Sequence, residues 1–427
     1  MFLSEHIKKR SLVFLTIVGG FWLLPLLGKA VDGNDLQLRE AEQLALDLDP
    51  LSKGFVTRSE AYSEESIAEG QLPDPTLTLG TESLPVDEFG IDEPMTQFQI
   101  GLQQAFPPGQ TLRYKREYAE ALSDVEVARS EERALRVLRD VRLRFLEVYY
   151  RSQSTKILQQ YRDLFAELFE ITQKQYAAGR DNQHEVLRAQ LELSLVEDRI
   201  LEAIMMRDAA SGELARLLTV EHSGRPLADA FPELQSLPDK PLLQERMLAH
   251  PLIRIEDAAL LASKKKIGEA EQQYKPGYSV DVTYGIRPGD DMDGRGLPNM
   301  LTAMVMVDLP LFTGKRQDKR LSAAKKESQA MQYERTARLY ELTGMLEREQ
   351  GKWERLNDRL ALYEQRVVAD AKLSTEATLQ AYQSDIADFT TLLRAQLTEL
   401  DTQLDMLQVR VERARAQARL LYLMGEI

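Results

Sequence analysis

The residue types that most often perform catalysis or bind metals are scarce in this sequence. It contains no cysteine, and its four histidines, His6, His184, His222 and His250, are isolated from one another. No His-Glu-x-x-His pair, phosphate-binding loop, Gly-x-Ser-x-Gly turn or complete calcium loop is present in the sequence. The sequence therefore predicts that this protein is not an enzyme and that it uses no cofactor and no bound metal.

Two short segments carry side chains that could still contact a cation. The run 290–294, Asp-Asp-Met-Asp-Gly, resembles the start of a calcium loop, but the later ligands are missing. Met304 and Met306 lie near Asp308, and thioethers suit Cu(I). Because methionine more often fills space than binds metal, we expect these two side chains to pack on the polar face of a strand.

Acidic residues gather at two predicted turns between helices. Gly179, Asp181 and Glu185 mark the first turn, and Asp385 and Asp388 mark the second, with Arg394 on the helix that follows. Glycine suits the positive φ at the end of a helix, and aspartate suits the first position of the next one. If copies of the chain met here, the carboxylates would form rings that favour cations. The alternative is that they only cap helices and face solvent.

The chain repeats itself. The sequence Leu-Arg-Ala-Gln-Leu occurs at 187–191 and again at 393–397, and His250-Pro251 takes the place in the second half that Asp49-Pro50 has in the first. A repeat this long predicts a tandem duplication and a pseudo-symmetric molecule. We divide the chain into a signal peptide, 1–30, and two repeats, 31–220 and 221–427. His250 is expected to serve as a connector.

Each repeat is predicted to contain a short helix, two strands and a long helical hairpin. The predicted ranges are 51–69, 76–83, 97–106, 111–176 and 182–220, followed by 252–274, 278–286, 301–309, 315–382 and 389–424. The strands alternate apolar and polar residues. The predicted apolar face carries Phe98, Ile100, Leu102, Val280, Val282, Val305 and Val307, and the polar face carries Gln97, Gln99, Asp281 and Met306. Such strands fit either a soluble core or a lipid-facing barrel with a wet interior.

The helical stretches contain no proline and show coiled-coil periodicity. The clearest seam steps by four and three residues through Leu393, Leu397, Leu400, Leu404, Leu407 and Val411. Periodicity alone also fits a cytosolic coiled-coil rod.

The N-terminus has the pattern of a secretory signal. A basic Lys8-Lys9-Arg10 precedes the uncharged stretch 11–28, and small residues at Gly28 and Ala30 predict cleavage after Ala30. An uncleaved membrane anchor is the alternative. No later stretch is long and apolar enough for a membrane helix, so later insertion would require strands. The net charge of −14 argues against nucleic-acid binding.

Four strands per chain cannot close a barrel. Open strand edges in lipid cost several kcal/mol for each unpaired backbone group, so only closed barrels span a membrane. Two copies would give about 8 strands and three about 12, which is wide enough for a pore. The chain is therefore expected to share its barrel with copies of itself.

Several motifs resemble one family over essentially the whole mature chain. Gln-Leu-Pro-Asp-Pro at 71–75, Pro-Pro-Gly-Gln at 107–110, Leu-Pro-Leu-Phe-Thr-Gly at 309–314 and Tyr176-x-x-Gly179 resemble the TolC family of outer-membrane efflux proteins. The first two look most like its heavy-metal (Cus/Czc-like) branch. The chain departs from the family at Asp385, which stands where the first turn has Gly179, and in lacking a lipid-bearing cysteine.

The resemblance implies an α+β membrane protein. It implies a homotrimer whose 12-stranded β-barrel, embedded in outer-membrane lipid, continues into a coiled-coil α-helical periplasmic tunnel. The partners it implies are a periplasmic adaptor (membrane fusion) protein and an inner-membrane pump of the RND type. The expected function is a passive export duct for metal ions or small toxic compounds. Gly179, Asp181, Glu185, Asp385, Asp388 and Arg394 are expected at the periplasmic gate and adaptor contact. The alternatives are a type I protein-secretion duct and a periplasmic coiled-coil adaptor or scaffold.

Overall fold

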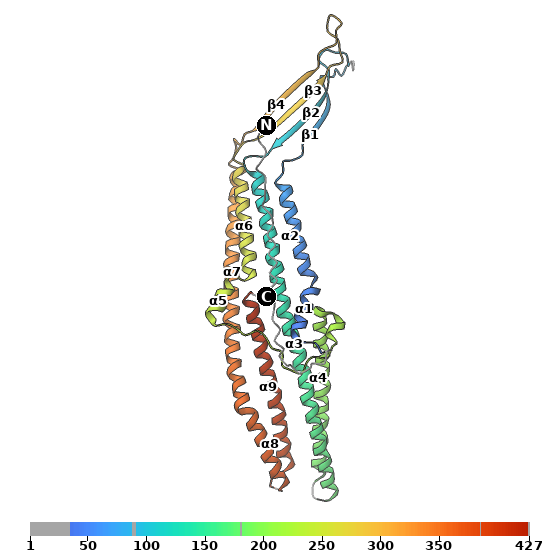
Figure 1. The fold of residues 1–427 in the computed structure, drawn as a ribbon, viewed down its shortest axis with the longest axis vertical. Helices are drawn as coiled ribbons and strands as arrows, with labels where there is room; N and C mark the ends of the chain where they lie inside the picture. The colour runs from blue at the N-terminus through green and yellow to red at the C-terminus, as the bar shows by residue number, and fades with distance from the viewer. Residues whose placement is uncertain (1–34, 88–90, 180–181, 385, 426–427) are drawn as a thin grey trace, which may run out of the picture.

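The computed structural model describes residues 35–87, 91–179, 182–384 and 386–425. The predicted signal peptide, Asp181 and Asp385 lie outside these ranges. The molecule is elongated, with a four-stranded sheet at one end and helices along the remaining length (Figure 1).

The long helices form a wall of four parallel columns. Its helices are α2 (Pro50–Glu69), α3 (Thr111–Ala177), α4 (Gln183–Ser223), α6 (Pro251–Gln272), α7 (Gln317–Leu362), α8 (Val368–Gln383) and α9 (Phe389–Leu423). At ~1.5 Å per residue, α3 alone is about 100 Å long. Both α2 and α4 pack along α3 at different heights, while α6 and α9 pack between α3 and α7. The wall therefore has edge columns formed by α2 with α4 and by α7 with α8.

The predicted helices and strands are confirmed, with three corrections. Helices α1 (Leu38–Leu48) and α5 (Lys240–Leu248) were not predicted, because both are too short to show a clear helical periodicity in the sequence. The stretch 315–382 is not one regular helix. It contains a π-helical turn, η1 (Tyr363–Val367), which needs no proline and therefore leaves no breaker in the sequence.

The four strands form one antiparallel sheet in the order β1-β2-β3-β4. They span Thr76–Glu82, Gln97–Phe106, Gly277–Ile286 and Met300–Asp308. Leu102 lies opposite Val282, and Val280 lies opposite Val305, so the predicted apolar residues share one face. Pairing of β2 with β3 joins the two halves of the chain, whereas β1 and β4 form the edges of the sheet.

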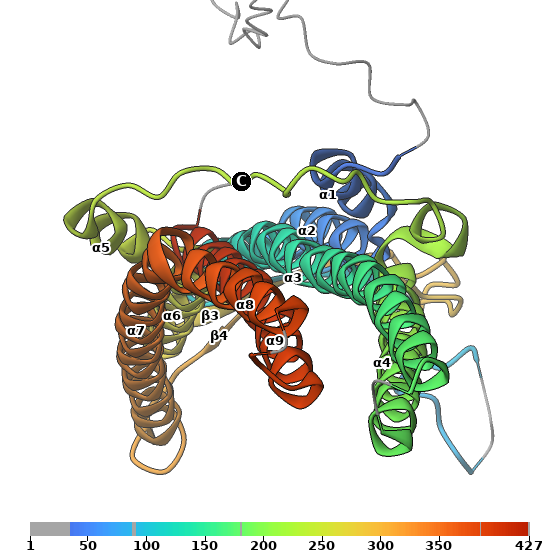
Figure 2. The same cartoon turned by 90° about the horizontal axis from the view of Figure 1, so that it is seen from below.

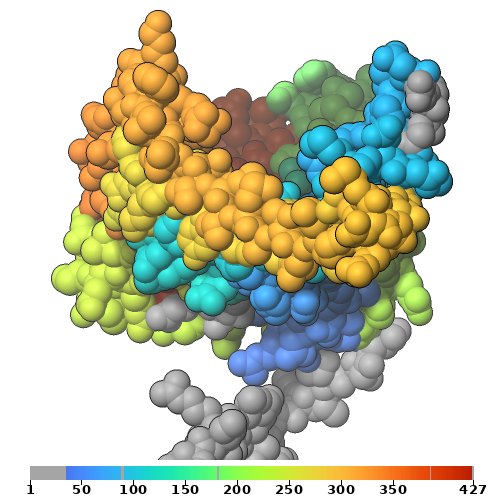
Figure 3. All heavy atoms as spheres, turned by 90° about the horizontal axis from the view of Figure 1, so that it is seen from above, coloured from blue at the N-terminus to red at the C-terminus, as the bar shows by residue number. Residues whose placement is uncertain are grey.

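The two faces of the helical wall differ. One face carries α1, α5 and the extended segment 225–239, which runs across the wall at mid-length (Figure 2). Leu36 donates its N–H to the carbonyl of Pro226 at 2.8 Å, and the Tyr149 hydroxyl donates to the carbonyl of Asp229 at 3.1 Å. The opposite face is concave, and parts of α4 and α9 are visible inside its hollow from above (Figure 3). None of the helices in the described part of the chain is long and apolar enough to cross a membrane.

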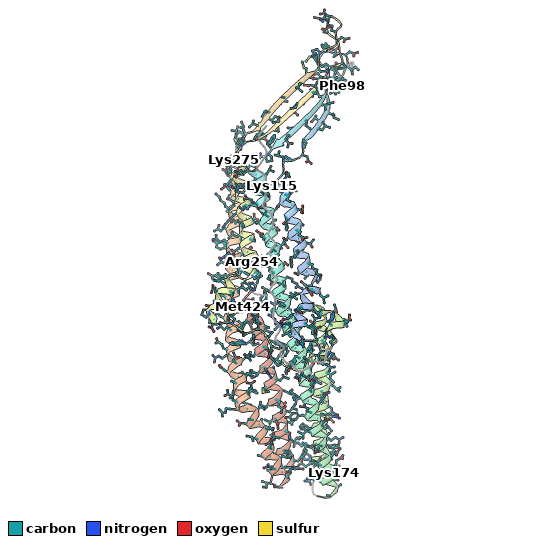
Figure 4. The ribbon with its side chains drawn as sticks, in the orientation of Figure 1. Phe98, Lys115, Lys174, Arg254, Lys275 and Met424 are labelled. Atoms are coloured by element: carbon teal, nitrogen blue, oxygen red, sulfur yellow. The ribbon has the colours of Figure 1, made fainter. Side chains whose placement is uncertain are left out.

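Asp49 and His250 join helices where α2 and α6 begin, and the buried Met424 lies near the middle of the molecule (Figure 4). Asp49 caps α2 by accepting the N–H of Ser52 at 2.8 Å, and it also accepts two hydrogen bonds from Arg133. His250 caps α6, since its Nδ1 accepts the N–H of Leu252 at 3.1 Å. The connector role predicted for His250 is confirmed.

His250 also joins the end of α9 to the start of α6. Its Nε2 lies 3.0 Å from the carbonyl oxygen of Tyr422, to which it donates because Nδ1 is the acceptor. The Tyr422 hydroxyl donates in turn to the buried Glu132 of α3 at 2.8 Å. Burial lowers the pKa of His250 to about 4, so the neutral ring is the form that this junction holds.

Candidate functional site at the helical turns

The first turn reverses the chain between α3 and α4 at the end of the wall remote from the sheet. Gly179 ends the helix with a φ of 70°, and its N–H donates to the carbonyl of Tyr176 at 2.9 Å. A left-handed glycine is a common way to end a helix, as the sequence predicted. Lys174, in the last turn of α3, lies close to this end (Figure 4).

The second turn, between α8 and α9, is built differently. The carbonyl of Ala381 accepts from the N–H groups of Ile386 and Ala387 at 2.9 and 3.2 Å. Asp388 then caps α9, because its Oδ1 accepts the N–H of Thr391 at 2.8 Å. The predicted cap role of Asp388 is thereby confirmed, and the two turns are not equivalent in geometry.

Hydrogen bonds tie the two helical hairpins together near their turns. The Tyr382 hydroxyl on α8 donates to Oε1 of Gln175 on α3 at 2.8 Å. Arg188 on α4 donates through Nη1 to the Thr390 hydroxyl on α9 at 3.3 Å. Phe165, Leu392 and other residues of α3, α4 and α9 form one hydrophobic core directly above. The two turns therefore form one structural unit.

The charged candidates have different surroundings. Hydrogen bonds from Thr391 lower the pKa of Asp388, and the nearby Arg188 and Arg394 lower it further. Arg394 itself is exposed. Glu185 is half-buried, and its Oε2 has no hydrogen-bond partner among the described residues. The structure thus brings Gly179, Glu185, Asp388 and Arg394 to one end of the molecule.

The other cation candidates have structural roles or lie apart. Oδ1 of Asp291 accepts the N–H groups of Asp293 and Arg295 at 2.9 and 2.8 Å, so this run forms a tight turn between β3 and β4. Met304 lies opposite Asp281, and Met306 lies opposite Ser279. Within the described ranges, no three His, Cys, Asp or Glu side chains are grouped closely enough to hold a metal ion.

The contacts among Gln175, Arg188, Thr390 and Tyr382 were not predicted. The two hydrogen bonds join residues that are 202 and 207 positions apart in the sequence. No local pattern in the sequence reports contacts between segments this distant.

Comparison with known proteins relates this fold to bacterial channels. A family model described as outer membrane efflux protein matches residues 68–220 and 242–426. No curated protein sequence matches the chain.

Three solved structures illustrate the likeness of the fold. CusC is 15% identical with a TM-score of 0.74, and the match covers 92% of this chain and 93% of CusC. The outer membrane protein VceC from Vibrio cholerae is 16% identical with a TM-score of 0.75, and the match covers 91% of this chain and 96% of VceC. The Neisseria gonorrhoeae MtrE outer membrane channel, in its open state, is 18% identical with a TM-score of 0.71, and the match covers 91% of this chain and 89% of MtrE.

Proposed function

Because this chain belongs to the outer membrane efflux protein family, we propose that three copies of it form the outer-membrane duct of a tripartite efflux system. The observation that carries this proposal is an open four-stranded sheet standing on a wall of four helical columns. Such a duct is passive. An RND-type inner-membrane pump, reached through a periplasmic adaptor, would supply the energy, and metal ions or small toxic compounds would be the cargo.

Closure of the sheet supports the trimer. Every residue of β1 and β4, the two edge strands, is exposed in the single chain. In a bilayer such edges must pair, so β1 of one copy is proposed to pair with β4 of the next. Three copies would complete a barrel of about 12 strands. On this proposal, the tandem duplication supplies two similar β-hairpins per copy. The chain is proposed to be exported and to lose residues 1–30 by cleavage of the signal peptide.

The edge columns of the helical wall are also complementary. On α7, Lys319, Lys326, Tyr333 and Tyr340 recur every seven residues and are exposed. Neither lysine forms an ion pair with any described residue. On α2, the small residues Gly54, Ala61 and Ala68 recur at the same spacing and are likewise exposed, as is Glu64 between them. Because α2 runs toward the sheet and α7 away from it, we propose that they pack as an antiparallel heptad seam between neighbouring copies.

The trimer can be tested through this seam. We expect the mature chain in the outer-membrane fraction, as a trimer by native mass measurement in mild detergent. Lys326→Glu should place like charges against Glu64 and weaken each interface by about 0.5–1 kcal/mol. The double variant Lys326→Glu with Glu64→Lys should restore the parent's heat-dissociation midpoint.

Lys325→Glu serves as the matched control, because this exposed lysine lies about 100° around the helix from Lys326. A monomer, or a chain that stays in the inner membrane, would contradict the proposed duct and favour a periplasmic adaptor or scaffold. Equal dissociation of the Lys325 and Lys326 variants would leave the trimer standing and place the seam elsewhere.

We further propose that the two turns form the periplasmic gate and meet the adaptor. Asp181, Glu185, Asp385 and Asp388 of three copies would surround the opening. Arg188→Ala with Tyr382→Phe removes the two hydrogen bonds that join the hairpins next to the turns, and it should raise single-channel conductance in planar bilayers. Asp388→Asn keeps a capping side chain but removes its charge, so it should reduce cation selectivity without opening the channel.

Tyr363→Phe is the control for the loosened gate, since its hydroxyl contacts Asp405 well above the turns. If the double variant and this control conduct alike, the turns do not close the channel. A type I protein-secretion duct would share this architecture. It would be distinguished by export of a protein rather than of small compounds.

A further inference from the structure

A groove with a volume of about 720 Å³ lies between α3, α4 and α9. Five guanidinium groups line it: Arg133, Arg144, Arg216, Arg415 and Arg419. The same lining contains three carboxylates, those of Asp140, Glu147 and Glu213. Within the lining the arginines therefore outnumber the carboxylates.

The groove opens on the concave face of the wall. Phe145 and Tyr149 of α3 pack beneath α1 and the segment 225–239, on the opposite face. Leu143 and Glu147, which line the groove, precede them by two residues and therefore point about 200° away around the helix. In the proposed trimer, the concave faces of the three copies would enclose the duct (Figures 2 and 3).

Two of the five arginines are held firmly by carboxylates. Arg133 Nη2 lies 2.7 Å from Oδ1 of Asp49, and Arg415 Nη1 lies 2.6 Å from Oε1 of Glu412. These two side chains are also the most buried of the five. They position the walls of the groove and, because they are largely buried, present little surface to a ligand.

Among the described residues, the other three arginines contact carboxylates only at longer distances. Arg144 and Arg216 share one oxygen of Glu213, at 3.4 and 3.3 Å, and Arg419 lies 3.5 Å from Glu349. Hydrogen bonds between guanidinium and carboxylate are normally about 2.7–2.9 Å, and each guanidinium has five N–H donors. Most donors of these three arginines are therefore available to a ligand.

Apolar side chains lie between the charged groups. Leu143, Met206 and Leu217 line the groove together with two alanines of α4. We infer that the groove binds an amphiphilic anion, with its carboxylate, sulfonate or phosphate on Arg144, Arg216 and Arg419 and its apolar body on these side chains. This inference rests on the proposed duct and specifies its cargo.

The binding test uses two probes that differ only in charge. Dansylglycine carries a carboxylate, and dansylglycinamide carries a neutral amide on the same fluorophore. The parent trimer in phosphatidylcholine nanodiscs should bind dansylglycine saturably above the signal of empty discs. The amide should bind about tenfold more weakly, equivalent to roughly 1.4 kcal/mol. Raising the salt concentration should weaken only the binding of dansylglycine.

Variants then locate the site. Arg144→Gln, Arg216→Gln and Arg419→Gln together should weaken dansylglycine binding about tenfold. Arg113→Gln, Arg116→Gln and Arg355→Gln remove the same charge from exposed arginines outside the groove and should leave dansylglycine binding unchanged. Glu213→Gln frees Arg144 and Arg216 and should tighten binding, a gain that misfolding cannot produce.

Two outcomes would overturn the inference: equal affinity for both probes, or unchanged affinity in the groove triple variant. The oligomeric mass and conductance are measured on the same preparations. A conducting trimer that does not bind dansylglycine overturns the inference alone. A preparation that binds the probe at the groove but neither trimerises nor conducts overturns the proposed function.

Discussion

Replacing Val282 or Val305 with arginine should destabilise the inserted sheet by about 2–4 kcal/mol if these positions lie near the bilayer midplane. The reason is the strand register. Val282 lies between Leu102 and Ala303 on one face of the sheet, and Val305 shares that face through its pairing with Val280. We expect this face to contact lipid. Refolding into lipid vesicles in a denaturant series, compared with the parent, measures the change.

The matched controls lie on the opposite face of the same sheet. Gln99→Arg and Met304→Arg should be tolerated, because Gln99 lies opposite Gly285 and Met304 lies opposite Asp281. A slip of one residue would exchange the two faces. If arginine is tolerated equally at Val305 and Met304, the apolar face does not contact lipid.

Acidification should destabilise the mid-length junction through His250. Its pKa is about 4 in the folded chain and about 6.5 when unfolded, so the unfolded chain binds more protons between these values. The stabilisation that comes from keeping His250 neutral is thus fully present above pH ~6.5 and is lost as the pH falls toward 4. The loss approaches about 3 kcal/mol, because each tenfold difference in proton affinity between the two states corresponds to ~1.36 kcal/mol. Urea unfolding at pH ~7.5 and ~4.5 measures it.

The variant His250→Asn isolates this contribution. Asparagine is a good helix cap whose Oδ1 can accept the N–H of Leu252 in place of Nδ1, but it does not titrate. The variant should therefore lose much less stability than the parent over the same pH interval. The neighbouring Glu132 carboxylate favours a charged imidazole and so opposes the effect of burial. If parent and variant lose stability equally, the ring of His250 does not control this pH dependence.

Much of the architecture could be predicted because its signals are local and long. Six heptad positions from Leu393 to Val411 identified α9, and its Leu393, Leu400 and Val411 are fully buried. Alternation in the strands identified their two faces, and the register places Leu102 and Val282 together. Both patterns repeat over many residues, so single exceptions do not obscure them.

The remaining features depend on contacts between distant segments. Helix α1 becomes apparent only when Ala41 and Ala45 meet α3, because eleven residues give little periodicity. At the turns, the caps were predictable from Gly179 and Asp388, but the bonds of Arg188 and Tyr382 were not. The groove brings together arginines from α3, α4 and α9, and no spacing in the sequence reports their proximity.

The π-helical turn η1 determines which residues are buried along the column formed by α7 and α8. Above it, buried or half-buried positions step by four and three through Leu342, Leu346, Glu349, Trp353, Leu356 and Leu360. If this spacing continued without interruption, the next buried position in α8 would be Ser374, but Ser374 is exposed. The buried residue is Thr375, whose hydroxyl donates to the carbonyl of Ala395. Tyr382 is displaced by one position in the same way. The single extra residue in the π-helical turn Tyr363–Val367 therefore shifts the buried positions by one. As a result, α7 packs its apolar side against α6 and α9, and α8 still packs its own against α9 down to the turn. A deletion there would preserve the helix but rotate its lower end by about 100°, turning Tyr382 away from Gln175.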